Sequence, residues 1–181
     1  MKTKLEKSFI IFFVYSVIGW IYELLIFYYH GKGWINRGFL YGPYLPVYGF
    51  GMLLLVSVLR KVYSRKKKDI KDWIIDILIV LVSVFLIATL VEYITHYVMD
   101  TFFGIKLWDY TKDYLNINGR VCFAASRNFA IGGTLLIYLV QPLVDRFIKN
   151  TKKKSLDRVS IVLFIIIVID LIVTIITKYL H

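Results

Sequence analysis

The chain has 181 residues, of which 59% are hydrophobic and 17% aromatic. A balance this apolar excludes an ordinary soluble domain, whose surface is largely polar, and is typical of a membrane protein. The formal net charge of +11 comes from 23 Lys and Arg against 12 Asp and Glu, and the single cysteine, Cys122, excludes an intrachain disulfide.

Five stretches are long and apolar enough to cross a bilayer core, which requires about 20 residues of helix. We predict an all-α, polytopic membrane helix bundle that forms a single transmembrane domain over residues 1–181. The predicted spans are 8–29, 40–59, 74–97, 121–144 and 159–180, and residues 98–120 form a long outer loop. The first span is too long for a signal peptide and lacks a small-residue cleavage site, so we interpret it as a retained helix.

Basic residues fall in alternate gaps between the spans. Three precede the first span, seven lie between the second and third, and six lie between the fourth and fifth. Because cytoplasmic loops carry the excess of Lys and Arg, we predict a multi-pass protein of the cell membrane with its N-terminus inside and its C-terminus outside. The runs SRKKKDIK and KNTKKKS are then cytoplasmic loops that contact anionic lipid head groups, and no nucleic-acid partner is expected.

The sequence NRGFLYGPYLPVYGFG at 36–51 opens the second span with poor helix formers. A helix that began only at Pro46 and ended at Leu59 would be roughly 21 Å long, too short for the bilayer core. Residues 38–45 are therefore expected at membrane depth, where irregular backbone is tolerated only inside protein or beside a wet cavity. We predict a second helix broken near its outer end, either as a kink packed for shape or as a break that lines a pocket.

Charged and aromatic side chains gather near the predicted outer ends of the spans. Each intramembrane charge costs about 2.5–3.5 kcal/mol or more and usually faces the bundle interior. The candidate ligand-binding residues are Glu23, Arg37, Glu92, His96, Asp109, Arg120 and Arg127. The candidate pocket-lining aromatic residues are Trp20, Tyr41, Tyr44, Tyr93, Trp108 and Tyr110.

This cluster admits two interpretations. Its charges either form structural ion pairs between Glu23 or Glu92 and the arginines, or also bind a ligand from outside. The excess of arginine favours a small anionic or zwitterionic ligand or a lipid head group. Asp170, near the middle of the fifth span, is a candidate proton or hydrogen-bond site, whereas Asp76 is expected to be solvated at the cytoplasmic boundary.

Several catalytic and cofactor motifs are absent, and we expect no cofactor and no metal. The chain has no G-x-x-x-x-G-K-[ST], so it cannot bind ATP through a P-loop, and it has no H-E-x-x-H or G-x-S-x-G. His96 and Asp100 are spaced as a dyad, but no nucleophile is evident beside them. A boundary histidine with a hydrogen bond at the membrane interface is therefore the favoured interpretation of His96.

Five segments carry a resemblance to a known family. They are GWIYE (19–23), NRGFLYGPYLPVYGFG (36–51), EYITHYVMDTFF (92–103), LWDY (107–110) and NINGRVCFAAS (116–126). They resemble the putative ABC-transporter type IV family, also called CmpB-like, over about four-fifths of the chain, leaving out the fifth span. The family's outer loop often reads WWDYS, where this chain reads LWDYT at 107–111.

The resemblance implies a transport permease, but the cytoplasmic loops are short and leave little room for the coupling helices that an ATPase would grip. We predict a small integral membrane permease or substrate-binding subunit with an outward-facing pocket, no ATPase of its own and a separate energising subunit as a candidate partner. One alternative is an outer-leaflet enzyme acting on lipid or cell-envelope material, with Glu23, Glu92 or His96 as acid or base. The other is a non-catalytic accessory protein, and an enzyme is not the favoured interpretation.

Overall fold

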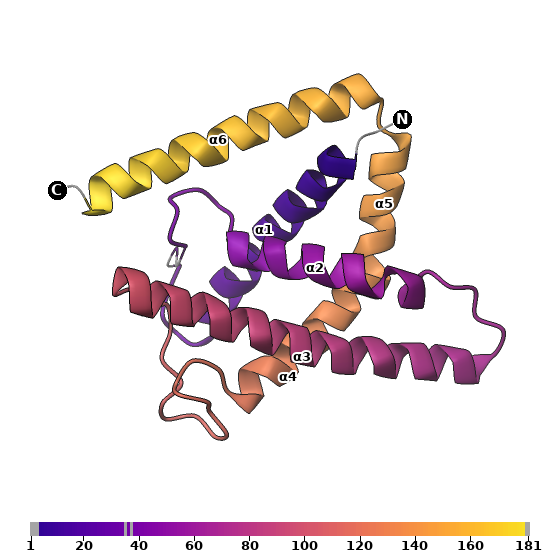
Figure 1. Cartoon of the computed structure of the whole chain (residues 1–181), viewed down its shortest axis with the longest axis horizontal. Helices are drawn as coiled ribbons and strands as arrows, with labels where there is room; N and C mark the ends of the chain where they lie inside the picture. Colours follow the sequence, from indigo (N-terminus) through magenta and orange to yellow (C-terminus); the bar gives the residue numbers. More distant parts are fainter. Residues whose placement is uncertain (1–3, 35, 37, 180–181) are drawn as a thin grey trace. The chain divides into compact units, whose positions relative to one another are not determined.

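A computed structural model describes residues 4–34, 36 and 38–179 (Figure 1). The helices are α1 (Lys4–Tyr29), α2 (Pro46–Tyr63), α3 (Ile70–Phe103), α4 (Phe123–Leu135), the π-helical turn η1 (Leu136–Val140), α5 (Gln141–Asn150) and α6 (Lys153–Tyr179). Within these ranges five helical stretches are long and apolar enough to cross a membrane, with α4, η1 and α5 forming one of them. The chain is therefore an all-helical, multi-pass membrane protein.

The chain divides into two compact units. The first unit comprises residues 1–53 and 144–181, and the second comprises residues 54–143. In the first unit α1 contacts α6, and in the second α3 packs against α4 (Figure 1). In line with the predicted topology, we call the C-terminal ends of α1 and α3 and the N-terminal ends of α2 and α4 their outer ends.

Helix α3 extends beyond the predicted span 74–97 at both ends. Asp69 is its N-cap, because its side chain accepts the N–H of Asp72 at 2.9 Å. Gly104 ends it with a left-handed φ of 66°, and the N–H groups of Gly104 and Ile105 bond to the last carbonyls of the helix. These polar caps fix the ends of the helix, whereas hydropathy marks only its apolar middle.

The fourth span continues to Asn150, past its predicted end at 144. Pro142 lacks an N–H, and in a regular α-helix its ring would clash with the carbonyl four residues earlier. The π-helical turn Leu136–Val140 ends two residues before this proline, and the N–H of Gln141 bonds to the carbonyl of Leu136. The wider turn gives the proline room, so the helix passes Pro142 without ending.

Helix α2 begins at Pro46 instead of residue 40 and ends at Tyr63 instead of residue 59. A proline suits this position because the first turn of a helix needs no N–H donor there. Residues 39–43 form bends, and the N–H of Leu45 donates to the carbonyl of Ser16 on α1 at 2.9 Å. This segment is therefore anchored to α1, and its depth in the membrane stays a prediction.

Gly49 is a position where α2 passes close to α1. A Cβ at this position would collide with Ser16 Oγ and would lie 2.5 Å from the backbone oxygen of Phe12. Backbone cannot rotate away, so we expect Gly49→Ala to lower the free energy of unfolding by about 1–3 kcal/mol. Thermal unfolding in detergent measures this loss.

Gly132→Ala is the matched control, because a Cβ there would meet nothing within 4 Å. Alanine is the better helix former, so this control should melt at or above the temperature of the parent protein. If Gly49→Ala melts no lower than Gly132→Ala, the close packing of α2 on α1 is wrong.

Candidate functional site

The outer half of α3 carries three of the predicted site residues, Glu92, Tyr93 and His96. Glu92 and His96 lie one helical turn apart, and their side chains are only 6% and 4% exposed. The long loop between α3 and α4 lies beside this end of α3 (Figure 1). Because buried polar groups require hydrogen bonds, the partners of these side chains on the loop define the site.

Loop residues 108 and 110 supply the first partners. Nε2 of His96 lies 2.8 Å from the carbonyl oxygen of Trp108. The centroids of the His96 and Trp108 rings are 5.5 Å apart. The hydroxyl of Tyr110 donates to Oε1 of Glu92 at 3.1 Å. Four sequence-predicted site residues are thus in contact in pairs, one member of each pair on α3 and the other on the loop.

Arg120, at the end of the loop, joins a second set of contacts on α3. Its Nη2 lies 3.3 Å from Oδ2 of Asp100, and its Nη1 lies 3.4 Å from the hydroxyl of Tyr93. Its guanidinium also lies over the ring of Tyr97, 4.9 Å from the centroid. The guanidinium of Arg120 therefore forms an ion pair with Asp100. The backbone carbonyl of Arg120 accepts the indole N–H of Trp108 at 2.6 Å.

The loop is shaped by a tight turn at Asn118 and Gly119, which have φ angles of 54° and 68°. Such left-handed conformations favour asparagine and glycine. The turn brings the carbonyl of Gly119 to the N–H of Tyr110 at 2.9 Å. Nearby, Oδ1 of Asp109 accepts the N–H of Thr111 at 2.9 Å, and this bond holds the pKa of the Asp109 carboxyl below its usual value. Asp109 is therefore ionised at neutral pH.

A small cavity of about 60 Å³ lies where α3 and the loop meet. It is lined by His96, Asp100, Lys106, Trp108, Asp109, Thr111, Asn118 and Gly119. Nδ1 of His96 is buried and has no hydrogen-bond partner among the described residues. The cavity thus lies against the ring of His96, its lining also includes two carboxylates and one lysine, and its volume admits a single small polar group.

The first unit holds the predicted residues of α1. The indole N–H of Trp20 donates to Oδ1 of Asn36 at 3.0 Å. The hydroxyl of Tyr48 on α2 donates to Oε1 of Glu23 at 2.5 Å, a short bond between a phenol and a carboxylate. Arg37, the third predicted residue of this region, lies outside the described residues. The predicted pairing of Arg37 with a glutamate therefore stays a prediction.

Asp170 on α6 is the hydrogen-bond acceptor for the segment that precedes α2. Its Oδ1 accepts the N–H of Tyr41 at 3.1 Å, and its Oδ2 accepts the N–H of Gly42 at 2.9 Å. The hydroxyl of Tyr44 donates to the same Oδ2 at 2.6 Å. Tyr41 and Tyr44, predicted as pocket-lining residues, are therefore held by one carboxylate.

Arg127 lies on the first turns of α4, where its Nε and Nη2 lie 3.4 Å and 3.2 Å from Oδ1 of the neighbouring Asn128. Arg127 is an exposed residue. The joint pocket predicted for Glu23, Glu92 and Arg127 draws on both units of the chain and stays a prediction.

Asp76 corrects an expectation, because it is not solvated but only 1% exposed. The basic loop before α3 folds back over it, with Arg65 Nε at 2.7 Å and Lys67 Nζ at 3.4 Å from Oδ2. Lys67 also donates to the carbonyl of Tyr63 at the end of α2 at 2.8 Å. The signal for this burial is the run of cations just before the third predicted span, which can pair with a carboxylate in the first turns of that helix as well as contact lipid.

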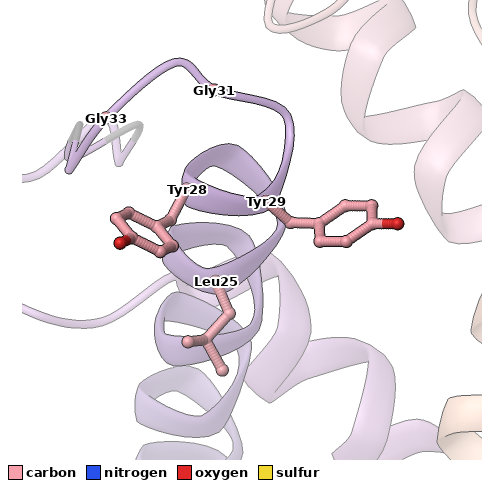
Figure 2. A pocket seen from close by; sticks show the side chains of 5 residues that line it. All are labelled: Leu25, Tyr28, Tyr29, Gly31 and Gly33. Carbon is pink, nitrogen blue, oxygen red and sulfur yellow. The ribbon is translucent and has the colours of Figure 1, made fainter.

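A larger hollow of about 700 Å³ lies at the outer end of α1, and Figure 2 shows Tyr28 and Tyr29 pointing to opposite sides of the helix there. Leu25, Gly31 and Gly33 are the other lining residues within the described part of the chain, and none of these five carries a charge. Exposed tyrosines at a helix end are typical of the interface between membrane and water. This hollow therefore has the character of a membrane-interface belt, and the polar cavity at His96 is the stronger candidate site.

Comparisons with known proteins give one match. The model of a family described as "Putative ABC-transporter type IV" matches residues 10–175 of the chain. No curated protein and no solved structure matches. The family match extends into α6, beyond the four spans on which the resemblance was recognised. The match confirms that resemblance, and the chain belongs to the putative ABC-transporter type IV family.

Proposed function

We propose that this protein is a ligand-binding membrane subunit of a transport system and that it receives a small polar ligand at its outer face. The observation that carries the proposal is the buried His96 ring, which lines a cavity and whose Nδ1 has no hydrogen-bond partner among the described residues. Leaving a buried polar atom unsatisfied costs about 1–3 kcal/mol. A ligand that supplies the missing bond would recover this cost.

Two further observations support a transport role. The chain belongs to a family described as an ABC transporter, and five of its helical stretches within the described ranges are able to cross a membrane. The sequence has no P-loop, so the energy for transport would come from a separate subunit. This energising subunit is the proposed protein partner.

The local geometry gives the enzyme alternative no specific support. Nε2 of His96 bonds to the carbonyl of Trp108, and the recorded partner of Asp100 is Arg120. A histidine that acts as a general base is usually held by a carboxylate or an equivalent group, which orients the imidazole ring toward the reacting atom. The recorded contacts therefore fit a binding site better than a catalytic dyad.

We expect His96→Gln to weaken ligand binding at least about tenfold, which corresponds to the loss of about 1.4 kcal/mol. Glutamine keeps an N–H donor for the carbonyl of Trp108 but removes the acceptor at the position of Nδ1. The purified protein in detergent is titrated with inorganic phosphate, acetate, glycine, ethanolamine and O-phosphoethanolamine. A ligand at about 100 times its Kd should raise stability by about 2.7 kcal/mol, which thermal unfolding detects.

His30→Gln is the matched control, because it makes the same change at an exposed histidine after α1. It should keep the full ligand-induced rise in melting temperature that His96→Gln loses. If no compound of the panel raises the melting temperature of the parent, the proposed function fails and an accessory role takes its place. If His96→Gln kept the full ligand-induced rise in melting temperature, the ligand would bind somewhere other than the α3 cavity.

A further inference from the structure

The ring of His96, which lines the cavity, has one nitrogen that donates a hydrogen bond and one that has no partner among the described residues. The carbonyl of Trp108 can only accept, so the hydrogen bond at 2.8 Å requires a proton on Nε2 of His96. In the neutral ring Nδ1 then carries a lone pair. Because Nδ1 is buried without a partner among the described residues, the missing group is a hydrogen-bond donor.

Two carboxylates line the same cavity as the ring of His96, Asp100 on α3 and Asp109 on the loop. A carboxylate offers about four acceptor positions. Asp100 has a recorded bond to Arg120 at 3.3 Å, and Asp109 has one to the N–H of Thr111 at 2.9 Å. Both therefore retain acceptor capacity, and together with the His96 ring they line a space of about 60 Å³.

We infer that this cavity receives a primary ammonium group and that the ligand is a small zwitterion, an inference that rests on the proposed function. An ammonium has three N–H donors and no acceptor, which suits a lining that contains two carboxylates. Within the described residues no group of three His, Cys, Asp or Glu side chains is arranged to hold a metal ion.

The charges around the cavity favour a zwitterion over a simple cation. Asp100 is balanced by Arg120, which leaves Asp109 and the exposed Lys106 as one negative and one positive group on the lining. An ammonium beside Asp109 and an anionic group beside Lys106 would satisfy both. A simple anion would face the carboxylate and the lone pair, and a simple cation would face the lysine.

Two sources carry this chemistry, a soluble zwitterion from outside and the head group of an ethanolamine phospholipid in the outer leaflet. Both present a primary ammonium a few bonds from a phosphate or carboxylate. The volume of the cavity accommodates only the ammonium end, so the rest of either ligand would lie toward the loop surface. The experiment below separates the two sources.

The test compares O-phosphoethanolamine with O-phosphocholine, whose nitrogen bears three methyl groups and no N–H. We expect O-phosphoethanolamine to raise the melting temperature of the purified chain at concentrations at least about tenfold lower than O-phosphocholine. Ethanolamine alone and inorganic phosphate alone should also be weaker. If the lipid is the natural source, nanodiscs that contain phosphatidylethanolamine should weaken the binding of O-phosphoethanolamine relative to nanodiscs of phosphatidylcholine.

Asp109→Asn tests the residue assignment. Asparagine keeps an oxygen for the N–H of Thr111 but loses the charge and one acceptor, so binding of O-phosphoethanolamine should weaken about tenfold or more. Asp113→Asn removes the same charge from the same loop outside the cavity lining and should bind like the parent.

The two proposals fail in different ways. Equal binding of O-phosphocholine, or stronger binding of inorganic phosphate, would overturn the ammonium inference while the proposed function stands. Full binding by Asp109→Asn would also overturn it. Failure of the whole panel to stabilise the parent in detergent or in either nanodisc would overturn both proposals.

Discussion

Replacing Asp76 by asparagine is expected to lower the free energy of unfolding by about 3–5 kcal/mol, because the change leaves a buried cation without its counter-ion. The side chain of Lys67 is only 6% exposed, and its Nζ lies 3.4 Å from Oδ2 of Asp76. Arg65 lies on the same oxygen at 2.7 Å. Thermal unfolding of the purified protein in detergent measures the loss.

Asp72→Asn is the matched control for this prediction. Asp72 lies one turn earlier on α3, and its side chain is 32% exposed. Its Oδ1 lies 3.8 Å from Nη2 of Arg65. An ion pair that is open to water contributes about 0–1 kcal/mol, so this variant should melt close to the parent. Replacing Asp76 and Lys67 together by leucine should recover part of the loss, because no buried charge then remains unpaired. Equal melting of Asp76→Asn and Asp72→Asn would show that the buried pair is absent.

Asp170→Asn is expected to lower the free energy of unfolding by about 2–4 kcal/mol. The carboxylate accepts the N–H groups of Tyr41 and Gly42 and the hydroxyl of Tyr44. Asparagine has one acceptor oxygen and one N–H₂ donor, so it cannot satisfy donors on both sides. Irregular backbone at membrane depth depends on such partners, and thermal unfolding or the rate of proteolysis in the segment before α2 reports their loss.

Tyr44→Phe is the milder comparison because it removes one hydrogen bond and leaves both backbone donors satisfied. It should cost about 1 kcal/mol, less than Asp170→Asn. Should the two variants melt together, or should Asp170→Asn match the parent, the carboxylate does not hold this segment.

The sequence predicts the membrane class well, because a hydrocarbon core imposes a minimum length of apolar helix. It also places the candidates Glu92 and His96 in one predicted span, and in the structure they lie one turn apart on α3. The bounds of the helices were less predictable. Asp69 and Gly104 lengthen α3 through local capping bonds, and the π-helical turn before Pro142 carries the fourth span past its predicted end.

The contacts of the site could not be predicted, because they depend on the path of a long loop. Trp108 reaches His96 because the chain turns back along α3 after Gly104, and Arg120 reaches Asp100 after a second turn at Asn118 and Gly119. The Asn-Gly pair is a recognised turn signal, but its position alone does not say which residues of α3 the loop will meet. Asp76 shows the same limit, since its burial depends on how the basic loop folds back.

Nitrogen-15 NMR of the protein labelled in its histidine rings tests the central claim, that Nδ1 of His96 is an open acceptor in a ligand site, most directly. His96→Gln assigns the signal, and His30 and His181 serve as internal references. The account predicts that in the neutral ring of His96 the proton is on Nε2, and that the Nδ1 resonance moves when O-phosphoethanolamine is added while the reference signals stay. A protonated Nδ1 in the free protein, or an Nδ1 resonance that stays fixed with every compound of the panel, would contradict it.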